Sequence, residues 1–316
     1  MTAQPTSPVR AEVRQDGSFV RQPNAFRNRI TSDGSSGYLA EPGRYHLYVS
    51  LACPWAHRSI IARRFKKLED VIGLTVVDPI RDERGWAFRD GPGHTVDTVN
   101  GFNFLSEAYL ATDPTYTGRF TVPALWDRRT HSIVTNDFHV LSTMLETEFE
   151  AYADRSVDLY PIPLREEIDA VNEAVFEDIN NGVYKAGFAV TQEAYEAAVQ
   201  TLFDRLDWLE ERLSSQRFLV GHQLTDADIR LWVTLVRFDA VYYGHFKCNL
   251  NRIVDYPNLW GYARDLYQRP GFGDTVNFDH IKRHYYMTHA NINPTRIVPL
   301  GPRVDWLAPH DRIKLS

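Results

Sequence analysis

YHLYVSLACPWAHRSIIARRFKK, residues 45–67, decides the fold of this chain. Its first six residues alternate apolar and polar side chains, as a strand does. From Pro54 to about Lys67, apolar and basic side chains recur at helical spacing. Residues 74–77 (LTVV) then have the composition of a second strand. Strand, helix and strand in this order predict the opening of an α/β unit.

Cys53 stands where the first strand gives way to the helix. Proline suits the first helical position because its missing N–H costs nothing there. Pro54 therefore places Cys53 at or near the N-cap, where the unpaired amides of the helix stabilise a thiolate. The competing interpretation is a small buried cysteine before a helix-initiating proline, but the strand-to-helix position favours a reactive thiol. Ala56 stands where a CxxC motif would have its second cysteine, which excludes a dithiol mechanism.

The composition is that of a soluble globular enzyme, with 43% hydrophobic and 24% charged residues among 316. A net charge of -6 provides no basic field to attract nucleic acid. Two cysteines suit a reducing compartment. The first residues lack the apolar core of a signal peptide, and no segment approaches the roughly 18 apolar residues of a membrane span. We therefore expect a cytoplasmic protein with neither nucleic acid nor membrane as a partner.

The chain divides into parts of different character. The N-terminal arm is polar and aperiodic, and we expect at most Phe19 and Phe26 to anchor it. A proline-containing linker near residue 160 precedes a purely helical half. We expect an N-terminal arm at residues 1–43 and an α/β domain at 44–155, with a long insert at 78–118. An all-helical domain at 156–290 and a tail at 291–316 follow.

The second half of the α/β domain has the pattern of a hairpin and a helix. Residues 120–126 and 132–135 form the hairpin, and the following helix carries Phe138, Leu141 and Leu145 on one face. In the helical half, Thr225 and Asp228 have the spacing of a capping box at a helix start. A β-α-β unit followed by β-β-α is the thioredoxin topology. With an all-α second domain, it resembles the glutathione transferases.

Several motifs carry this resemblance across residues 19–302. Cys-Pro-Trp-Ala at 53–56 and Thr-Val-Pro at 121–123 are similar to the superfamily in general. The blocks NNGVYKAGF, HFKCN and HIKRHYY, at 180–188, 245–249 and 280–286, resemble the glutathionyl-hydroquinone reductases, the xi class of these transferases. The resemblance implies the glutathione transferase fold and a homodimer.

The resemblance also implies a reaction. The Cys53 thiolate attacks the sulfur of a thiol adduct on a hydroquinone ring, which gives a mixed disulfide and the reduced ring. A second thiol molecule resolves the mixed disulfide. Tyr184 and Tyr285 match positions of the acceptor pocket, where they stabilise and protonate the departing carbanion. A serine or tyrosine at position 53 would only activate a thiol for conjugation.

Further positions match those that bind the thiol in the family. Trp86 and Arg119 match glutathione contacts, although by themselves they suggest a core indole and a solvated turn arginine. Pro123 matches a cis-proline that faces the cysteine and leaves the Val122 backbone free to pair with a peptide-like thiol. Taken alone, Pro123 also suits a strand edge.

Asp137 and Phe138 depart from the family pattern. A Glu-Ser pair usually stands here, where the acid binds the γ-glutamyl amine and the serine and helix amides bind its carboxylate. A missing hydrogen bond to a buried carboxylate costs about 1.5–3 kcal/mol. Two interpretations stay open. Either Phe138 belongs to the apolar stripe and backbone amides bind glutathione alone, or the thiol is another small one, such as mycothiol.

Other functions and sites are less favoured. An omega-like thioltransferase, acting on dehydroascorbate or protein mixed disulfides, shares the cysteine chemistry but does not require the two tyrosines. A non-catalytic module would have lost Cys53. His280 and His284 are spaced i, i+4 with His289 nearby, but no third ligand has a defined spacing, so we predict no metal site.

Overall fold

Four short strands form one mixed sheet in the computed structural model, which describes residues 12–315. The strand order is β2-β1-β3-β4, with β1 parallel to β2 and antiparallel to β3, and with β3 antiparallel to β4. Leu47 at the centre of β1 pairs with Leu74 on one side and Leu125 on the other. The strands are β1 (Tyr45–Val49), β2 (Gly73–Val76), β3 (Ala124–Asp127) and β4 (Ser132–Thr135).

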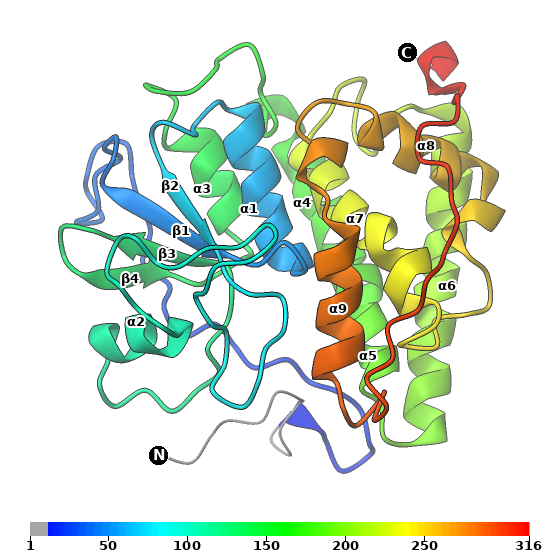
Figure 1. The fold of residues 1–316 in the computed structure, drawn as a ribbon. Coiled ribbons are helices and arrows are strands. Elements are labelled where there is room, and N and C mark those ends of the chain that lie inside the picture. Colours follow the sequence, from blue (N-terminus) through cyan, green and yellow to red (C-terminus); the bar gives the residue numbers. More distant parts are fainter. Residues whose placement is uncertain (1–11, 316) are drawn as a thin grey trace. The chain divides into compact units, whose positions relative to one another are not determined.

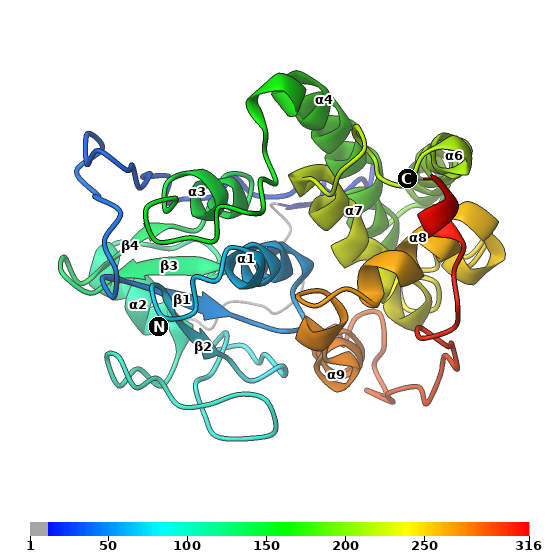
Figure 2. The same ribbon diagram turned by 90° about the horizontal axis from the view of Figure 1, so that it is seen from above.

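Helices cover this sheet as the thioredoxin topology requires. The parallel pair β1 and β2 needs a crossover, which α1 (Pro54–Phe65) provides. Helix α1 packs against α3 (Leu141–Thr147), and both lie on the same face of the sheet (Figures 1 and 2). Helix α2 (Leu105–Thr112), inside the predicted insert, contacts β4. All five residues of β1 are buried, because this strand has neighbours on both edges and helices over it.

One helix boundary differs from the prediction. Helix α3 begins at Leu141, so the prediction that Phe138 lies on it is wrong. The Asp137 carboxylate accepts a hydrogen bond from the His139 backbone N–H at 3.1 Å, as the side chain does in an Asx turn. This local bond forms a turn before the helix, although Phe138 is buried as the apolar stripe predicted.

The remaining helices belong mainly to a second, all-helical unit. The predicted apolar stripe of α6, from Val199 to Leu213, is buried as expected. Helix α7 starts at the predicted capping box, where Asp228 Oδ2 accepts a hydrogen bond from the Thr225 N–H at 2.8 Å. The helices are α4 (Arg165–Val175), α5 (Gly182–Gly187), α6 (Gln192–Ser215), α7 (Asp226–Arg237) and α8 (Pro257–Tyr267), with π turns at Phe176–Asn180 and Phe238–Tyr242 and 3₁₀ turns at Ile162–Leu164, Ile253–Asp255, Gly273–Thr275 and Arg312–Leu315.

The contacts divide the described chain into two units. The thioredoxin-like unit contains Pro23–Asp158 and Asp279–Ala290, and the helical unit contains 12–22, Leu159–Phe278 and 291–315. Helix α9 (Phe278–Thr288) thus belongs almost wholly to the thioredoxin-like unit, whereas the sequence placed it in the helical domain. Histidine side chains on α9 bond to backbone carbonyls of the insert, and helical periodicity alone does not reveal such partners.

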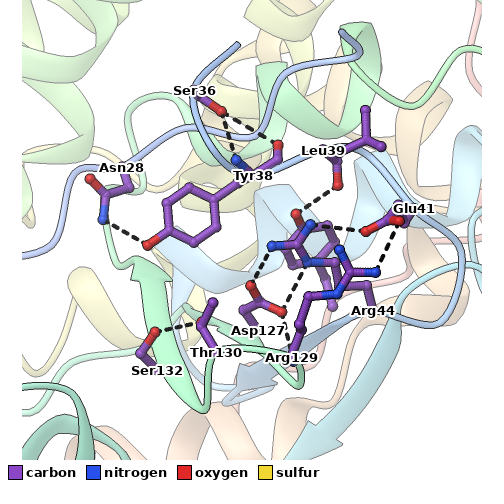
Figure 3. Close-up of polar contacts among 11 residues, drawn as sticks. Asn28, Ser36, Tyr38, Leu39, Glu41, Arg44, Asp127, Arg129, Thr130 and Ser132 are labelled. Atoms are coloured by element: carbon purple, nitrogen blue, oxygen red, sulfur yellow. Dashed lines mark hydrogen bonds and ion pairs between the residues drawn. The ribbon is translucent and has the colours of Figure 1, made fainter. Parts of the chain in front are cut away.

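The N-terminal arm is divided between the two units: residues 12–22 belong to the helical unit and residues 23–43 to the thioredoxin-like unit. Phe19 is buried in the helical unit, with its ring centroid 5.4 Å from that of Phe188. In the thioredoxin-like unit, Arg44 beside the arm makes a bidentate ion pair with buried Asp127, at 3.0 and 2.7 Å, and a third bond to Glu41 at 2.9 Å (Figure 3). A bidentate guanidinium pair of this kind fixes both position and orientation. Of the described helices, none has the length and apolar character that crossing a membrane requires.

Candidate active site

Cys53 is the N-cap residue of α1, as predicted, with extended backbone angles (φ -78°, ψ 120°) and Pro54 in the first helical turn. Its side chain is 9% exposed, and Sγ lies 3.4 Å from the carbonyl oxygen of Val122. The side chain makes no capping hydrogen bond to the amides of α1. The thiol thus donates to the Val122 carbonyl and does not cap the helix.

The loop opposite the cysteine contains the predicted cis-proline, since the Val122–Pro123 peptide bond is cis. Thr121 holds this loop in place: its carbonyl accepts from the buried Tyr109 hydroxyl at 2.7 Å, and its Oγ1 accepts from Asn136 Nδ2 at 3.0 Å. The N–H of Val122 finds no acceptor among residues 12–315. It is thus available to pair with an extended peptide-like ligand beside the cysteine.

Asp137 lies in the turn that follows β4. Its Oδ1 accepts from Asn24 Nδ2 at 2.9 Å and from the His139 N–H at 3.1 Å, and its backbone carbonyl accepts from Leu141 N at 3.1 Å. The carboxylate is half-buried and forms no ion pair with any residue from 12 to 315. An oriented carboxylate without a protein cation is suited to binding a ligand ammonium group.

Phe138 packs on the start of α1. Its ring centroid lies 4.5 Å from that of Trp55, at an interplanar angle of 31°, and the side chain is 7% exposed. Trp55 follows Cys53 by two residues, so Phe138 packs on the first turn of the helix that Cys53 caps. These contacts agree with the packing interpretation of Phe138, and the site has no hydroxyl at this position.

Trp86 and Arg119 lie in the insert and the loop after it. The Trp86 indole is buried and stacked on His284 of α9, with centroids 4.8 Å apart and an angle of 20°. The Arg81 guanidinium lies 5.3 Å from the same indole. The Arg119 carbonyl accepts a hydrogen bond from the Tyr116 hydroxyl at 2.8 Å, two residues before Thr121.

The two predicted tyrosines belong to different units. Tyr285 is buried on α9 in the thioredoxin-like unit, where its ring lies 5.2 Å from His284 and 5.6 Å from His289. Tyr184 is buried on α5 in the helical unit, with the Arg21 guanidinium 4.7 Å from its ring centroid. Trp86 and Tyr285 are therefore linked through His284.

Comparisons with known proteins identify the family. Models described as "Glutathione S-transferase, N-terminal domain" and "Glutathione S-transferase, C-terminal domain" match residues 52–148 and 192–265. "Glutathionyl-hydroquinone reductase YqjG" of Escherichia coli is 52% identical over 303 residues, which cover 94% of this chain and 92% of that protein. "Glutathionyl-hydroquinone reductase PcpF" of Sphingobium chlorophenolicum is 49% identical, covering 90% of each. The chain belongs to the glutathionyl-hydroquinone reductases.

Solved structures of family members agree with this assignment. The glutathione-bound structure of YqjG is matched with a TM-score of 0.89 at 52% identity, over 92% of this chain and 96% of that one. The xi glutathione transferase of Phanerochaete chrysosporium is matched with a TM-score of 0.91 at 50% identity, over 95% and 97%. The glutathione transferase fold and the family resemblance predicted from the sequence are thus confirmed.

Sequence reasoning missed contacts that complete the site of this glutathionyl-hydroquinone reductase. Asn24 bonds to Asp137, 113 residues away. Buried Asn136 accepts from the Phe26 N–H at 2.9 Å while its amide donates to Thr121, so it connects the arm to the cis-proline loop. No local pattern could reveal these pairs, because the arm has no periodicity and its partners are distant in sequence.

The histidines of α9 have structural partners in this reductase. His280 Nε2 donates to the Pro92 carbonyl at 2.6 Å and His284 Nδ1 to the Pro79 carbonyl at 2.8 Å. Within residues 12–315, no three His, Cys, Asp or Glu side chains are arranged to hold a metal ion. Cys248 is fully buried, and desolvation raises the pKa of its thiol, which keeps it protonated at neutral pH.

Proposed function

We propose that this protein reduces thiol-adducted hydroquinones to hydroquinones through a mixed disulfide on Cys53. The observation that carries the proposal is the position of Cys53, at the N-cap of α1 and beside the cis-proline loop. A thiolate at a helix N-terminus is stabilised by the amides and the dipole of the helix. Family membership supports the substrate class, because the relatives carry the name of glutathionyl-hydroquinone reductases.

The proposed reaction has two displacement steps. First, the Cys53 thiolate attacks the adduct sulfur: a sulfur–sulfur bond forms, the bond between sulfur and the ring carbon breaks, and its electron pair stays on the ring. The ring carbon then takes a proton, and the whole ring leaves as the hydroquinone. Second, another thiolate molecule attacks the mixed disulfide, which releases the oxidised thiol dimer and restores Cys53. The ring gains two electrons, and two thiol molecules supply them.

We assign the proton transfer to Tyr285 and Tyr184. Their phenols would hydrogen-bond the quinol oxygens and protonate the ring carbon, in line with the family positions that they match. Burial of both side chains supports this role, because a hydrogen bond to developing charge is stronger in a site that excludes water. An omega-like thioltransferase uses the same cysteine, and loss of the phenols should separate the two activities.

We assign thiol binding to residues around the cysteine. The Val122 N–H, beside cis-Pro123, would pair with the peptide backbone of the thiol, and Asp137 would bind its ammonium group. Trp86 and Arg119 are assigned to the thiol by their match to the family. Glutathione is the thiol indicated by the family and by its glutathione-bound members.

Mycothiol is a second candidate for the thiol, because Phe138 has no hydroxyl to bind a γ-glutamyl carboxylate. This residue replaces the serine that would bind a γ-glutamyl carboxylate, and its ring is engaged with Trp55. A thiol without the γ-glutamyl group would lose no hydrogen bond when phenylalanine replaces that serine. We also propose a homodimer in the cytoplasm. Light scattering of the purified chain tests its assembly, and microscopy of a tagged chain in its host tests its location.

Intact-protein mass spectrometry tests the proposed function. The reduced protein is mixed with a quinol that carries either glutathione or mycothiol, and the released quinol is quantified. Addition of one thiol to Cys53 with one equivalent of free quinol is the expected result. The thiol that reacts faster identifies the physiological class. If Cys53 stays unmodified with both adducts, the proposed function is wrong.

A further inference from the structure

We propose that Asn24 of the N-terminal arm is a positioning residue, which orients the Asp137 carboxylate so that the site prefers thiols bearing an ammonium group. The inference rests on the proposed function, because it concerns the thiol of that reaction. It adds a segment far from the cysteine in sequence to the thiol site. Neither family membership nor the sequence motifs identify this role.

The hydrogen bonds on Asp137 are all on one side of its carboxylate. Asn24 Nδ2 and the His139 N–H both donate to Oδ1, at 2.9 and 3.1 Å. No donor within residues 12–315 bonds to Oδ2. Two donors on one oxygen fix the plane of the carboxylate and leave the other oxygen for a ligand.

Asn24 is held firmly by the arm around it. Two residues on, Phe26 makes a reciprocal pair with Asn136: its N–H donates to Asn136 Oδ1 at 2.9 Å, and its carbonyl accepts from Asn136 N at 3.1 Å. The Thr135 hydroxyl also donates to the Phe26 carbonyl, at 3.0 Å. The Phe26 ring lies 5.5 Å from that of buried Tyr109, whose hydroxyl bonds to the cis-proline loop. The Asn24 amide is thus positioned by the same contacts that shape the loop beside Cys53.

The charge balance of the site indicates what Asp137 binds. Asp127, at the end of β3, is fully buried and is neutralised by the bidentate Arg44 (Figure 3). Asp137 is half-buried and is oriented by a neutral amide instead. Asn24 therefore directs the carboxylate without cancelling its charge, which suits a cationic ligand group. In glutathione, that group is the γ-glutamyl ammonium.

A binding experiment with two ligands and two variants tests the inference. The ligands are glutathione and its deaminated analogue, in which hydrogen replaces the ammonium group. Asn24→Ala removes the amide at Asp137. Asn28→Ala is the matched control, because Asn28 is also an arm asparagine but donates to the Tyr38 hydroxyl at 3.3 Å (Figure 3). Dissociation constants come from calorimetry on the full chain.

The expected result is specific to one variant and one ligand. Asn24→Ala should weaken glutathione binding about 3- to 10-fold, the usual effect of one hydrogen bond, and leave the analogue unchanged. Asn28→Ala should change neither. At saturating thiol adduct, the kcat of Asn24→Ala should equal that of the wild type, while KM rises. An Asn24→Ser variant, with a smaller donor, should recover part of the affinity, and thermal unfolding verifies the fold of each variant.

Two results would overturn the inference without touching the proposed function. One is an equal loss of affinity for both ligands in Asn24→Ala, which would indicate that Asn24 has only a structural role. The other is a wild-type protein that binds glutathione no better than the deaminated analogue. Failure of Cys53 to form the mixed disulfide with any thiol adduct would overturn the proposed function instead, and that assay uses wild-type protein alone.

Discussion

Cys53 Sγ lies 3.4 Å from the carbonyl oxygen of Val122, the residue before cis-Pro123. A carbonyl oxygen only accepts, so this contact requires the protonated thiol as donor. A thiolate would face the oxygen lone pairs and be repelled. We therefore expect the sulfur to turn toward the first amides of α1 when it loses its proton, and the Val122 carbonyl then becomes available to the backbone of a bound thiol.

Only one of the two cysteines should carry the activity. Cys53→Ser should lower the reductase rate at least about 1000-fold, because a hydroxyl at this site cannot form the mixed disulfide. Cys248→Ala should keep the rate, because the Cys248 thiol is buried and burial raises its pKa. Steady-state rates and iodoacetamide labelling at pH 7.5 measure both effects. Labelling of Cys248 at the rate of Cys53 would contradict the assignment.

Removal of one hydroxyl should separate the two candidate activities. Tyr285→Phe should slow quinol release about 100-fold, the usual contribution of a general acid, while exchange with a low-molecular-weight disulfide stays at the wild-type rate. Tyr286→Phe is the matched control, because it is the adjacent tyrosine of α9 and is only half-buried. Stopped-flow absorbance of the quinol and a coupled disulfide assay give the two rates. Equal loss of both rates in Tyr285→Phe would indicate a structural role.

Histidine protonation should destabilise the thioredoxin-like unit in acid. His46 Nδ1 accepts from Arg128 at 3.1 Å, so its Nε2 carries the proton and bonds to Thr75 Oγ1 at 2.7 Å. Burial, together with the Arg128 charge, lowers the pKa of His46 to about 4. The unfolded chain, with its ordinary histidine pKa of about 6.5, therefore binds more protons between these values. The contribution of neutral His46 to the free energy of unfolding is complete above pH 6.5 and is lost as the pH falls toward 4.

A variant isolates this contribution from other titrating groups. Between pH 7.5 and 5, the wild type should lose about 2 kcal/mol more unfolding free energy than His46→Gln. Urea unfolding at the two pH values measures the difference. The control is His131→Asn, since His131 is exposed in the hairpin turn, and it should follow the wild type. An identical pH dependence in His46→Gln and the wild type would contradict the prediction.

The sequence predicted those features of the site that have local signals. The cysteine before a helix-initiating proline located the N-cap of α1, whereas the cis bond at Pro123 was expected from the family resemblance. The start of α3 was misplaced, because the apolar spacing of Phe138 fits a helix equally well and does not show that Asp137 closes a turn on His139. Contacts between distant segments, such as Asn24 with Asp137, have no local signal at all.

The same limit explains the assignment of α9. Its amphipathic pattern predicts a helix with a buried face, but that pattern is satisfied by packing against any apolar surface. The partners are set by His280 and His284, whose rings bond to carbonyls of residues 92 and 79. A carbonyl is present at every residue, so its identity as a partner cannot be deduced from side-chain type.

Phe138 offers a test in which stability and thiol binding should change in opposite directions. Phe138→Ser introduces a hydroxyl at this position but removes the ring packed on Trp55. The loss of a buried aromatic ring should cost about 3–5 kcal/mol of unfolding free energy. The new hydroxyl can hydrogen-bond the γ-glutamyl carboxylate, so KM for the glutathione adduct should fall up to about tenfold.

Phe138→Leu separates these two effects, because leucine keeps most of the apolar contact and adds no hydroxyl. It should lose less stability than Phe138→Ser and leave KM unchanged, as measured by urea unfolding and by kinetics with the glutathione adduct. A lower KM in both variants would mean that the bulk of the ring, rather than the missing hydroxyl, limits glutathione binding. An unchanged KM in Phe138→Ser would mean that backbone groups alone bind the carboxylate, and Phe138 would then be a packing residue.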